Sequence, residues 1–204
     1  MANFPYLDFF TMIHCMASYY HPSSAKPFRC VFESCVDMIP TDDPLKVVIY
    51  EAYQQIPLTD FDLSSNDALL QWTYRINSYV HRQLYNSPYI EFSKFKEKYE
   101  PANMTITTWS HPTWKMIHYL ASIYNLSEVF ALSYKAFASC LQFLLPCPKC
   151  REHLTVNLSR HPIDEYFGSA IDLFTWSYVL HQTVSSSIGK SGISLKDAKK
   201  LYDL

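Results

Sequence analysis

The chain repeats part of itself at a spacing of 104 residues. Residues 10–20 read FTMIHCMASYY and residues 114–124 read WKMIHYLASIY, with six identical positions. Residues 68–80 and 172–184 lie at the same offset and share a further four residues. Because the order and the spacing are both kept, the sequence predicts two copies of one structural unit rather than a chance likeness between amphipathic segments.

Apolar residues recur at helical spacing in both copies, which predicts an all-α fold of two tandem bundle units with four or five helices each. The chain holds only three glycines, which excludes a glycine-rich phosphate-binding loop and disfavours a turn-rich β-sandwich. In the second copy we expect helices from Ser110 or Thr113 to about Tyr124, from Ser127 to about Leu145, from Cys147 to before Pro162, from Ser169 to Ile188 with Gly189 closing it, and from Leu195 to Tyr202.

The boundary between the copies is expected in a charged, proline-bearing stretch. We expect a first unit over residues 1–90, a linker over 91–109 and a second unit over 110–204.

The strongest local motif is Cys147-Pro148-Lys149-Cys150. Proline after Cys147 favours a helix start there, and the positive end of a helix favours the thiolate form of a cysteine. Two thiols at this spacing suit redox chemistry. The same pair could bind zinc together with His153 and His161, which would make the chain a zinc-stabilised interaction module.

Two further patterns lie on helices. Trp114 and His118 are four residues apart and share a face, and Trp176 precedes His181 by five residues. Residues 181–190 read HQTVSSSIGK. Each pattern by itself is typical of a buried helix face.

Taken in this order, the patterns of residues 110–190 resemble the Erv/ALR family of FAD-dependent sulfhydryl oxidases. The family shows Trp-x3-His, then Cys-x2-Cys, then His-Asn-x-Val-Asn-x-x-Leu-Gly-Lys. His181, Val184, Gly189 and Lys190 match the last motif, whereas Gln182 and Ser185 stand where the family has asparagine.

The resemblance implies a helical bundle that binds FAD and places it against the two cysteines. It implies catalytic roles for Cys147 and Cys150. The cofactor-binding residues that it implies are Trp114, His118, Tyr124, Trp176, His181, Val184, Ser185 and Lys190.

The implied reaction is disulfide formation in protein dithiols, with electrons passing through Cys147, Cys150 and FAD to O2 and giving H2O2. Cys147 would be the outer sulfur, which the substrate attacks, and Cys150 the sulfur nearer the flavin. The implied assembly is a homodimer. A non-catalytic virion structural protein with a decayed oxidase fold stays open as an alternative.

The first copy lacks these residues. Phe10 stands for Trp114 and Asn77 for His181, and we expect Thr41 and Pro44 at the places of the two cysteines. A degenerate copy before an active one resembles the insect-virus, baculovirus-type members of the family. The resemblance implies that the first half packs where a second subunit packs in the dimeric members.

Cys30 and Cys35 are the candidates for a shuttle pair, although the repeat aligns Cys35 with Cys140 and favours core positions for both. The net charge of −2 offers no basic surface for nucleic acid. Neither a signal peptide nor a membrane span is expected, so we expect the host cytoplasm or nucleus, and the virion in addition.

Overall fold

The computed structural model describes residues 4–61 and 63–204, and all regular secondary structure in these residues is helical. This confirms the all-α fold class. The helices are α1 (Tyr6–Ser18), α2 (Ala25–Met38), α3 (Pro44–Gln55), α4 (Asn66–Tyr85), α5 (Phe92–Lys98), α6 (Ile106–Ser122), α7 (Glu128–Leu141), α8 (Pro148–Arg160), α9 (Ala170–Ser187) and α10 (Leu195–Lys200), with short 3-10 turns η1 (Pro22–Ser24), η2 (Leu58–Asp60), η3 (Pro101–Asn103) and η4 (Asp164–Tyr166).

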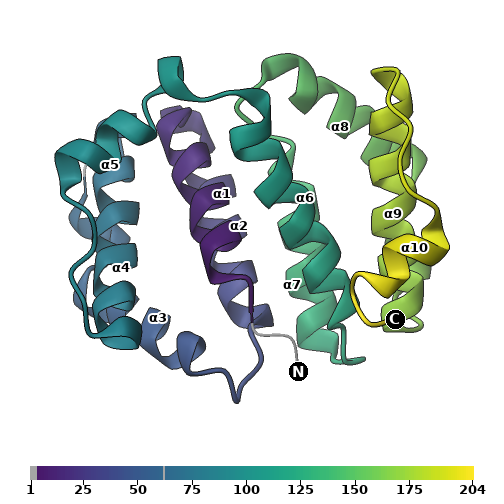
Figure 1. Ribbon diagram of the computed structural model, residues 1–204, viewed down its shortest axis with the longest axis horizontal. Helices are drawn as coiled ribbons and strands as arrows, with labels where there is room; N and C mark the ends of the chain where they lie inside the picture. Colours follow the sequence, from purple (N-terminus) through teal and green to yellow (C-terminus); the bar gives the residue numbers. More distant parts are fainter. Residues whose placement is uncertain (1–3, 62) are drawn as a thin grey trace.

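The two halves of the chain lie side by side and meet along four helices (Figure 1). In the middle of the molecule α1 packs along α6, and α2 packs along α7 behind them. On the outer sides α4 packs on α1 and α9 packs on α6, while α5 and α10 cover α4 and α9. The arrangement of α1–α5 is therefore repeated by α6–α10.

Side-chain hydrogen bonds repeat with the helices, since their donor residues lie 104 residues apart and their acceptor residues lie 103 to 105 residues apart. The equivalent bonds are His14 Nδ1 to Thr73 Oγ1 at 3.0 Å and His118 Nδ1 to Ser177 Oγ at 2.8 Å, Trp72 Nε1 to the Ile56 carbonyl at 2.9 Å and Trp176 Nε1 to the His161 carbonyl at 2.8 Å, and Tyr74 Oη to the Ile90 carbonyl at 2.9 Å and Tyr178 Oη to the Ile193 carbonyl at 2.8 Å. The repeat therefore extends to the polar contacts that hold each helix bundle together.

Several helix ends lie where the sequence predicts them. The side chains of Ser127, Cys147 and Ser169 each accept a backbone N–H at the start of α7, α8 and α9. Gly189 follows α9 with a φ of 72°, the left-handed conformation that glycine adopts without strain. Local capping chemistry therefore predicts the starts of α7, α8 and α9 correctly, and the end of α9.

The start of α6 differs from the prediction. The helix begins at Ile106 rather than near Ser110 or Thr113, because Thr105 and Thr108 form a capping box. Pro112 lies inside the helix, and Thr113 Oγ1 donates to the Trp109 carbonyl at 2.6 Å in the same turn. The proline therefore does not end the helix that carries Trp114 and His118.

The segment expected as a linker, residues 91–109, is mostly structured. It contains α5, η3 and the first residues of α6. Phe95 and Tyr99 are completely buried, four residues apart, while the lysines between them face solvent. The segment therefore contains an amphipathic helix, α5, although its charged side chains are typical of a linker. In the first half, α5 is the counterpart of α10.

The expected alignment of the two cysteines with Thr41 and Pro44 is wrong. Both α3 and α8 begin with a proline, at Pro44 and Pro148, and the residue before each proline caps the helix. At the constant offset, Asp43 therefore corresponds to Cys147 and Lys46 to Cys150.

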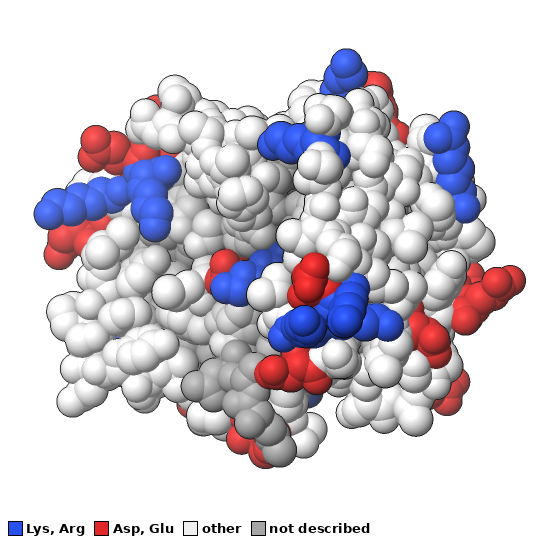
Figure 2. Space-filling view, turned by 45° about the vertical axis from the view of Figure 1, so that its right-hand side comes forward, with Lys and Arg blue, Asp and Glu red and all other residues white. Residues whose placement is uncertain are grey.

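Acidic and basic side chains are interspersed on the face shown in Figure 2. Lys115 Nζ and Asp8 Oδ2 form an ion pair at 2.6 Å that links α6 to α1. An ion pair this exposed contributes at most about 1 kcal/mol, so apolar packing holds the halves together. Within the residues described, we find no helix with the length and apolar character that a membrane crossing requires.

Candidate functional site

An aromatic cluster lies between α6 and α9 in the second half. Trp114 and His118 extend from α6, and His181 extends from α9. The rings of Trp114 and His181 stack nearly parallel, with centroids 4.1 Å apart and planes 7° apart. The His118 ring lies 5.1 Å from that of His181. The structure thus brings together three of the residues that the sequence predicts for cofactor binding.

The histidines of this cluster form a directed chain of hydrogen bonds. Ser177 Oγ donates to the Phe174 carbonyl at 2.7 Å, so its oxygen accepts from His118 Nδ1 at 2.8 Å. Nε2 of His118 is then the acceptor for Nδ1–H of His181, at 2.9 Å. This chain leaves Nε2 of His181 unprotonated, and the described residues give it no hydrogen-bond donor.

Both histidines are neutral at physiological pH. Burial, with a smaller contribution from the nearby His181, lowers the pKa of His118 to about 3. Burial, followed by the charge of His111, lowers the pKa of His181 to about 4. The cluster therefore presents neutral rings and a free nitrogen lone pair rather than positive charge.

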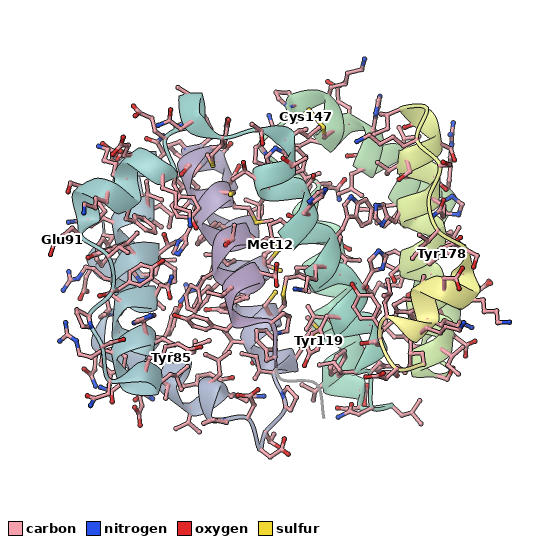
Figure 3. The ribbon with its side chains drawn as sticks, viewed as in Figure 1. Met12, Tyr85, Glu91, Tyr119, Cys147 and Tyr178 are labelled. Carbon is pink, nitrogen blue, oxygen red and sulfur yellow. A yellow bond between two sulfur atoms is a disulfide. The ribbon has the colours of Figure 1, made fainter. Side chains whose placement is uncertain are left out.

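Cys147 and Cys150 form a disulfide at the first turn of α8, with Cα atoms 5.1 Å apart. Cys147 is the residue that caps the helix, and its Sγ accepts the backbone N–H of Cys150 at 3.2 Å. Both residues are partly buried. Figure 3 labels Cys147 at the end of the bundle where α8 lies, and α8 packs on α9.

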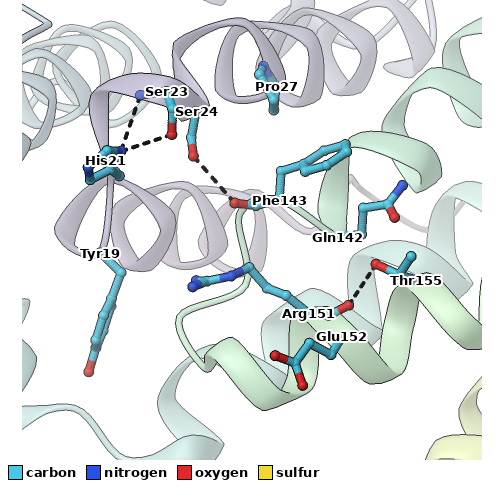
Figure 4. Close-up of a pocket in the computed structure, with 10 residues that line it drawn as sticks. All are labelled: Tyr19, His21, Ser23, Ser24, Pro27, Gln142, Phe143, Arg151, Glu152 and Thr155. Atoms are coloured by element: carbon cyan, nitrogen blue, oxygen red, sulfur yellow. Dashed lines mark hydrogen bonds between the residues drawn. The ribbon is translucent and has the colours of Figure 1, made fainter.

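A cleft opens beside this turn, between the two halves (Figure 4). Its volume is about 430 Å³. The first half contributes Tyr19, His21, Ser23, Ser24 and Pro27, and the second half contributes Gln142, Phe143, Arg151, Glu152 and Thr155. Arg151 directly follows Cys150, so the cleft borders the disulfide's own helical turn.

Two residues predicted for cofactor binding have the contacts of core residues instead. Trp176 is 1% exposed, packs against Tyr134 and donates its indole N–H to the His161 carbonyl. Tyr124 packs against Phe130 and donates to the Phe167 carbonyl at 3.2 Å. Neither ring belongs to the cluster of Trp114, His118 and His181.

The remaining predicted residues follow His181 along the same helix. Val184 and Ser185 are partly buried, and Lys190 is exposed just beyond the helix end. The side-chain amide of Gln182 lies against the backbone of Gly192. A Cβ atom added at Gly192 would come within 2.0 Å of Gln182 Nε2. The glutamine thus contacts the segment that follows α9.

Sequence reasoning missed two residues of the site. Ser177 accepts from His118, and Tyr202 brings its ring to 5.9 Å from that of His118. The repeat carried a signal for the first, because a hydroxyl residue, Thr73, stands at the equivalent place. Tyr202 comes from the chain end after α10, and nothing local in the sequence indicates that contact.

The equivalent place in the first half is filled by its own side chains. His14 is completely buried, with the rings of Phe95 and Tyr99 at 4.6 and 4.9 Å. Asn77 Nδ2 donates to His14 Nε2 at 2.9 Å, and Asn77 Oδ1 accepts from Tyr6. In the second half, by contrast, Trp114 and His181 are only partly buried.

The alternative zinc site is not supported by the geometry. Cys147 precedes α8 and His161 follows it, so the length of the helix separates them by about 20 Å. Within residues 4–61 and 63–204, no three His, Cys, Asp or Glu residues are grouped so as to hold a metal ion. His161 Nε2 lies instead 3.3 Å from Thr183 Oγ1.

Comparisons with known proteins identify relatives of the second half. The family model described as "Erv1 / Alr family" matches residues 111–203. A protein named FAD-linked sulfhydryl oxidase from African swine fever virus is 26% identical over 97 residues, which are 47% of this chain and 80% of the relative. No solved structure matches.

A second relative comes from Acanthamoeba polyphaga mimivirus and is named "Probable FAD-linked sulfhydryl oxidase R368". It is 30% identical over 98 residues, which are 47% of this chain and 68% of the relative. The matched region of the family model, residues 111–203, holds the aromatic cluster, the disulfide and the closing glycine. On the strength of these matches, the chain belongs to the Erv1 / Alr family.

Proposed function

We propose that this protein is an FAD-dependent sulfhydryl oxidase that forms disulfide bonds in protein substrates. The observation that carries the proposal is a disulfide at the start of α8 in the same helical bundle as the stacked Trp114 and His181. The relatives named FAD-linked sulfhydryl oxidases match this half of the chain.

The residues of the cluster are chemically suited to a flavin nucleotide. The parallel rings of Trp114 and His181 offer flat faces against which a planar ring system can stack. Nε2 of His181 is left as an acceptor for an N–H donor, in line with the neutral state of both histidines. We assign Trp114, His118 and His181 to the cofactor's rings, Val184 and Ser185 to its nucleotide part, and Lys190 to its phosphates.

Trp176 and Tyr124 are buried in the core of the bundle that carries the site. Their polar atoms are already bonded to carbonyl groups of His161 and Phe167, so they shape the bundle rather than bond the cofactor.

Thiol–disulfide exchange at Cys147 and Cys150 starts the reaction. A substrate thiolate attacks Cys147 Sγ, a mixed disulfide forms, and Cys150 leaves as a thiolate. The second substrate thiolate attacks the substrate sulfur of that mixed disulfide and releases Cys147. The substrate has then lost two electrons and two protons, and both cysteines are reduced.

The first turn of α8 assists the release of Cys147. The N–H of Cys150 already points at Cys147 Sγ, and the positive helix end stabilises negative charge on this sulfur. When bound, FAD supplies the acceptor for the two electrons of the reduced pair and the outlet to O2, which gives H2O2. Because His118 and His181 are neutral, they add no positive charge at the site of the cofactor's rings.

We further propose that the substrate polypeptide approaches through the cleft between the halves. Arg151 and Glu152 extend from the disulfide's helix into this cleft, and Tyr19 and His21 face them from the first half (Figure 4). Substituting Tyr19 by alanine should then raise KM for a reduced protein substrate while leaving KM for dithiothreitol unchanged.

The first half is proposed to be a degenerate copy that acts as a structural partner, as in the insect-virus members. In the first half, the rings of Phe95 and Tyr99 pack against the buried His14, and Asp43 and Lys46 stand at the places of the two cysteines. We propose that this unit includes α5, and that the catalytic unit begins with α6.

The visible absorption spectrum of the purified protein tests the proposal. A sulfhydryl oxidase should be yellow with about one FAD per chain, and should release H2O2 when given dithiothreitol. Cys150→Ala should keep the flavin and lose thiol oxidation. A colourless protein without thiol oxidase activity would instead support the non-catalytic virion structural protein.

A further inference from the structure

Two cysteines outside the site face each other between the halves. Cys30 lies on α2 and Cys140 lies on α7, and these two helices pack along each other. Cys30 Sγ lies 3.7 Å from the carbonyl oxygen of Ala136, which is one helical turn before Cys140. Both cysteines are partly buried free thiols.

The two thiols also interact directly. The pKa of Cys140 is raised to about 12 by burial and then by the interaction of its thiol with that of Cys30. A raised pKa leaves little thiolate of Cys140 at neutral pH, so this thiol reacts slowly in exchange with other disulfides. Such slow exchange suits a structural bond better than a shuttle that turns over with every catalytic cycle.

The other free cysteines offer no competing pair. Cys35 follows Cys30 by five residues on α2, so the helical rise alone separates their Cα atoms by about 7.5 Å. A disulfide spans at most about 7 Å between Cα atoms, so the shuttle pair Cys30–Cys35 cannot form while α2 is intact. Cys15 is fully buried against the Thr108 carbonyl.

We propose that Cys30 and Cys140 form a disulfide that covalently joins the two halves of the protein. The two thiols lose two electrons and two protons as their sulfurs bond. The Cys147–Cys150 disulfide of a second copy takes these up, since its S–S bond breaks and two thiols form. The choice of this oxidant rests on the proposed function, whereas the pairing itself rests on the contact between α2 and α7.

The bond would act mainly on the unfolded chain. It closes a loop that includes most of α2 through α7, and long loops lose the most conformational freedom when they are closed. Because the joined helices already pack in the folded state, the thermal midpoint should rise on the order of 10 °C upon oxidation.

Peptide mapping of the 204-residue protein tests the pairing. The protein is incubated with oxidised glutathione, alkylated without reduction and digested. We expect a peptide pair that joins Cys30 to Cys140 with the loss of two hydrogens, in the wild type and also in Cys150→Ala. Alkylation of both thiols after oxidation, or Cys30 joined to any other cysteine, would overturn the proposal.

Thermal unfolding gives a second, independent measurement. The oxidised wild type should unfold at a higher temperature than the protein in which only Cys30 and Cys140 have been reduced. This difference should vanish in Cys30→Ser and Cys140→Ser, which both keep the Cys147–Cys150 disulfide. An equal difference in these variants would contradict the cross-link.

The two proposals can fail separately. If Cys150→Ala forms the cross-link with glutathione but the wild type never forms it in air, the pairing stands and the oxidase is not its oxidant. If the wild type oxidises dithiothreitol but both thiols stay free, the oxidase stands and the cross-link fails.

Discussion

At the scale of the residue, His181 differs from its counterpart Asn77 in one property that matters. Both side chains donate to the Nε2 atom of the histidine on the neighbouring helix, at 2.9 Å in each half. Only His181 adds a ring that stacks on an indole. The substitution His181→Asn should therefore keep the hydrogen-bond chain and remove the stacking face.

We predict that His181→Asn weakens FAD binding by about two- to tenfold, because one aromatic contact contributes roughly 0.5–1.5 kcal/mol. The melting temperature of the cofactor-free protein should change little. Flavin retention after dialysis measures the effect, and His153→Asn, at an exposed position of α8, is the matched control. Wild-type flavin retention by His181→Asn would remove this residue from the site.

The lowered pKa values of His118 and His181 predict a pH dependence of stability. Below about pH 6.5 the unfolded chain binds protons at these residues, whereas the folded protein stays neutral down to about pH 3 to 4. Stability should therefore fall as the pH decreases through this window, by about 2 kcal/mol for each histidine at pH 5.

Urea unfolding of the cofactor-free protein at pH 7 and pH 5 measures this loss. His181→Asn should reduce the difference between the two pH values, since it removes one of the groups that titrate on unfolding. Equal stability of the wild type at both values would show that these histidines are charged in the folded state.

At the scale of the element, the end of α9 depends on a glycine. Gly189 has a φ of 72°, and no atom lies within 4 Å of the place that a Cβ would take. The end of α4 uses Asn86 instead, with a φ of 49°. Gly189→Ala therefore tests backbone strain alone, without a steric clash.

We predict that Gly189→Ala lowers the free energy of unfolding by about 1 kcal/mol, and that Gly189→Asn costs less than half of this, because asparagine tolerates the left-handed region. Urea unfolding at fixed pH compares the two variants with the wild type. If alanine and asparagine have the same effect, the conformation at residue 189 does not limit stability.

Local signals were sufficient to predict the helices that start with a capping side chain, such as Ser127 and Ser169. They failed where a residue's usual role misleads. Ser110 and Thr113 are usual capping residues, but α6 begins at Ile106 and contains both of them. The charged lysines of α5 led to the prediction of a linker, although Phe95 between them is buried.

In the candidate site, too, local patterns predicted some features and failed to predict others. Periodicity placed Trp114 and His118 on one helix face, but the stacking of Trp114 on His181 joins two helices and follows only from their packing. The approach of Cys30 to α7 also joins the two halves, so no pattern along either helix could reveal it.

At the scale of the whole molecule, the second half relies on the first to cover its inner helices. The ring of Tyr119 on α6 contacts that of Phe4 at 5.6 Å, and α7 is covered by α2. Removing α1–α5 would expose this apolar surface to water.

A fragment of residues 104–204 should therefore self-associate or aggregate at micromolar concentration. Light scattering coupled to size-exclusion chromatography measures its mass. The reference is the 204-residue chain, for which the family resemblance predicts a homodimer. A folded, monomeric fragment would show that the first half is dispensable for the bundle.

The most direct test of the account is an anaerobic titration of the purified protein with dithiothreitol, followed by the visible absorbance of its flavin. The wild type should lose this absorbance as the dithiol is oxidised and regain it when air is admitted, and Cys150→Ala should keep it throughout. Loss of absorbance at the same rate in Cys150→Ala would contradict electron transfer through the disulfide at α8.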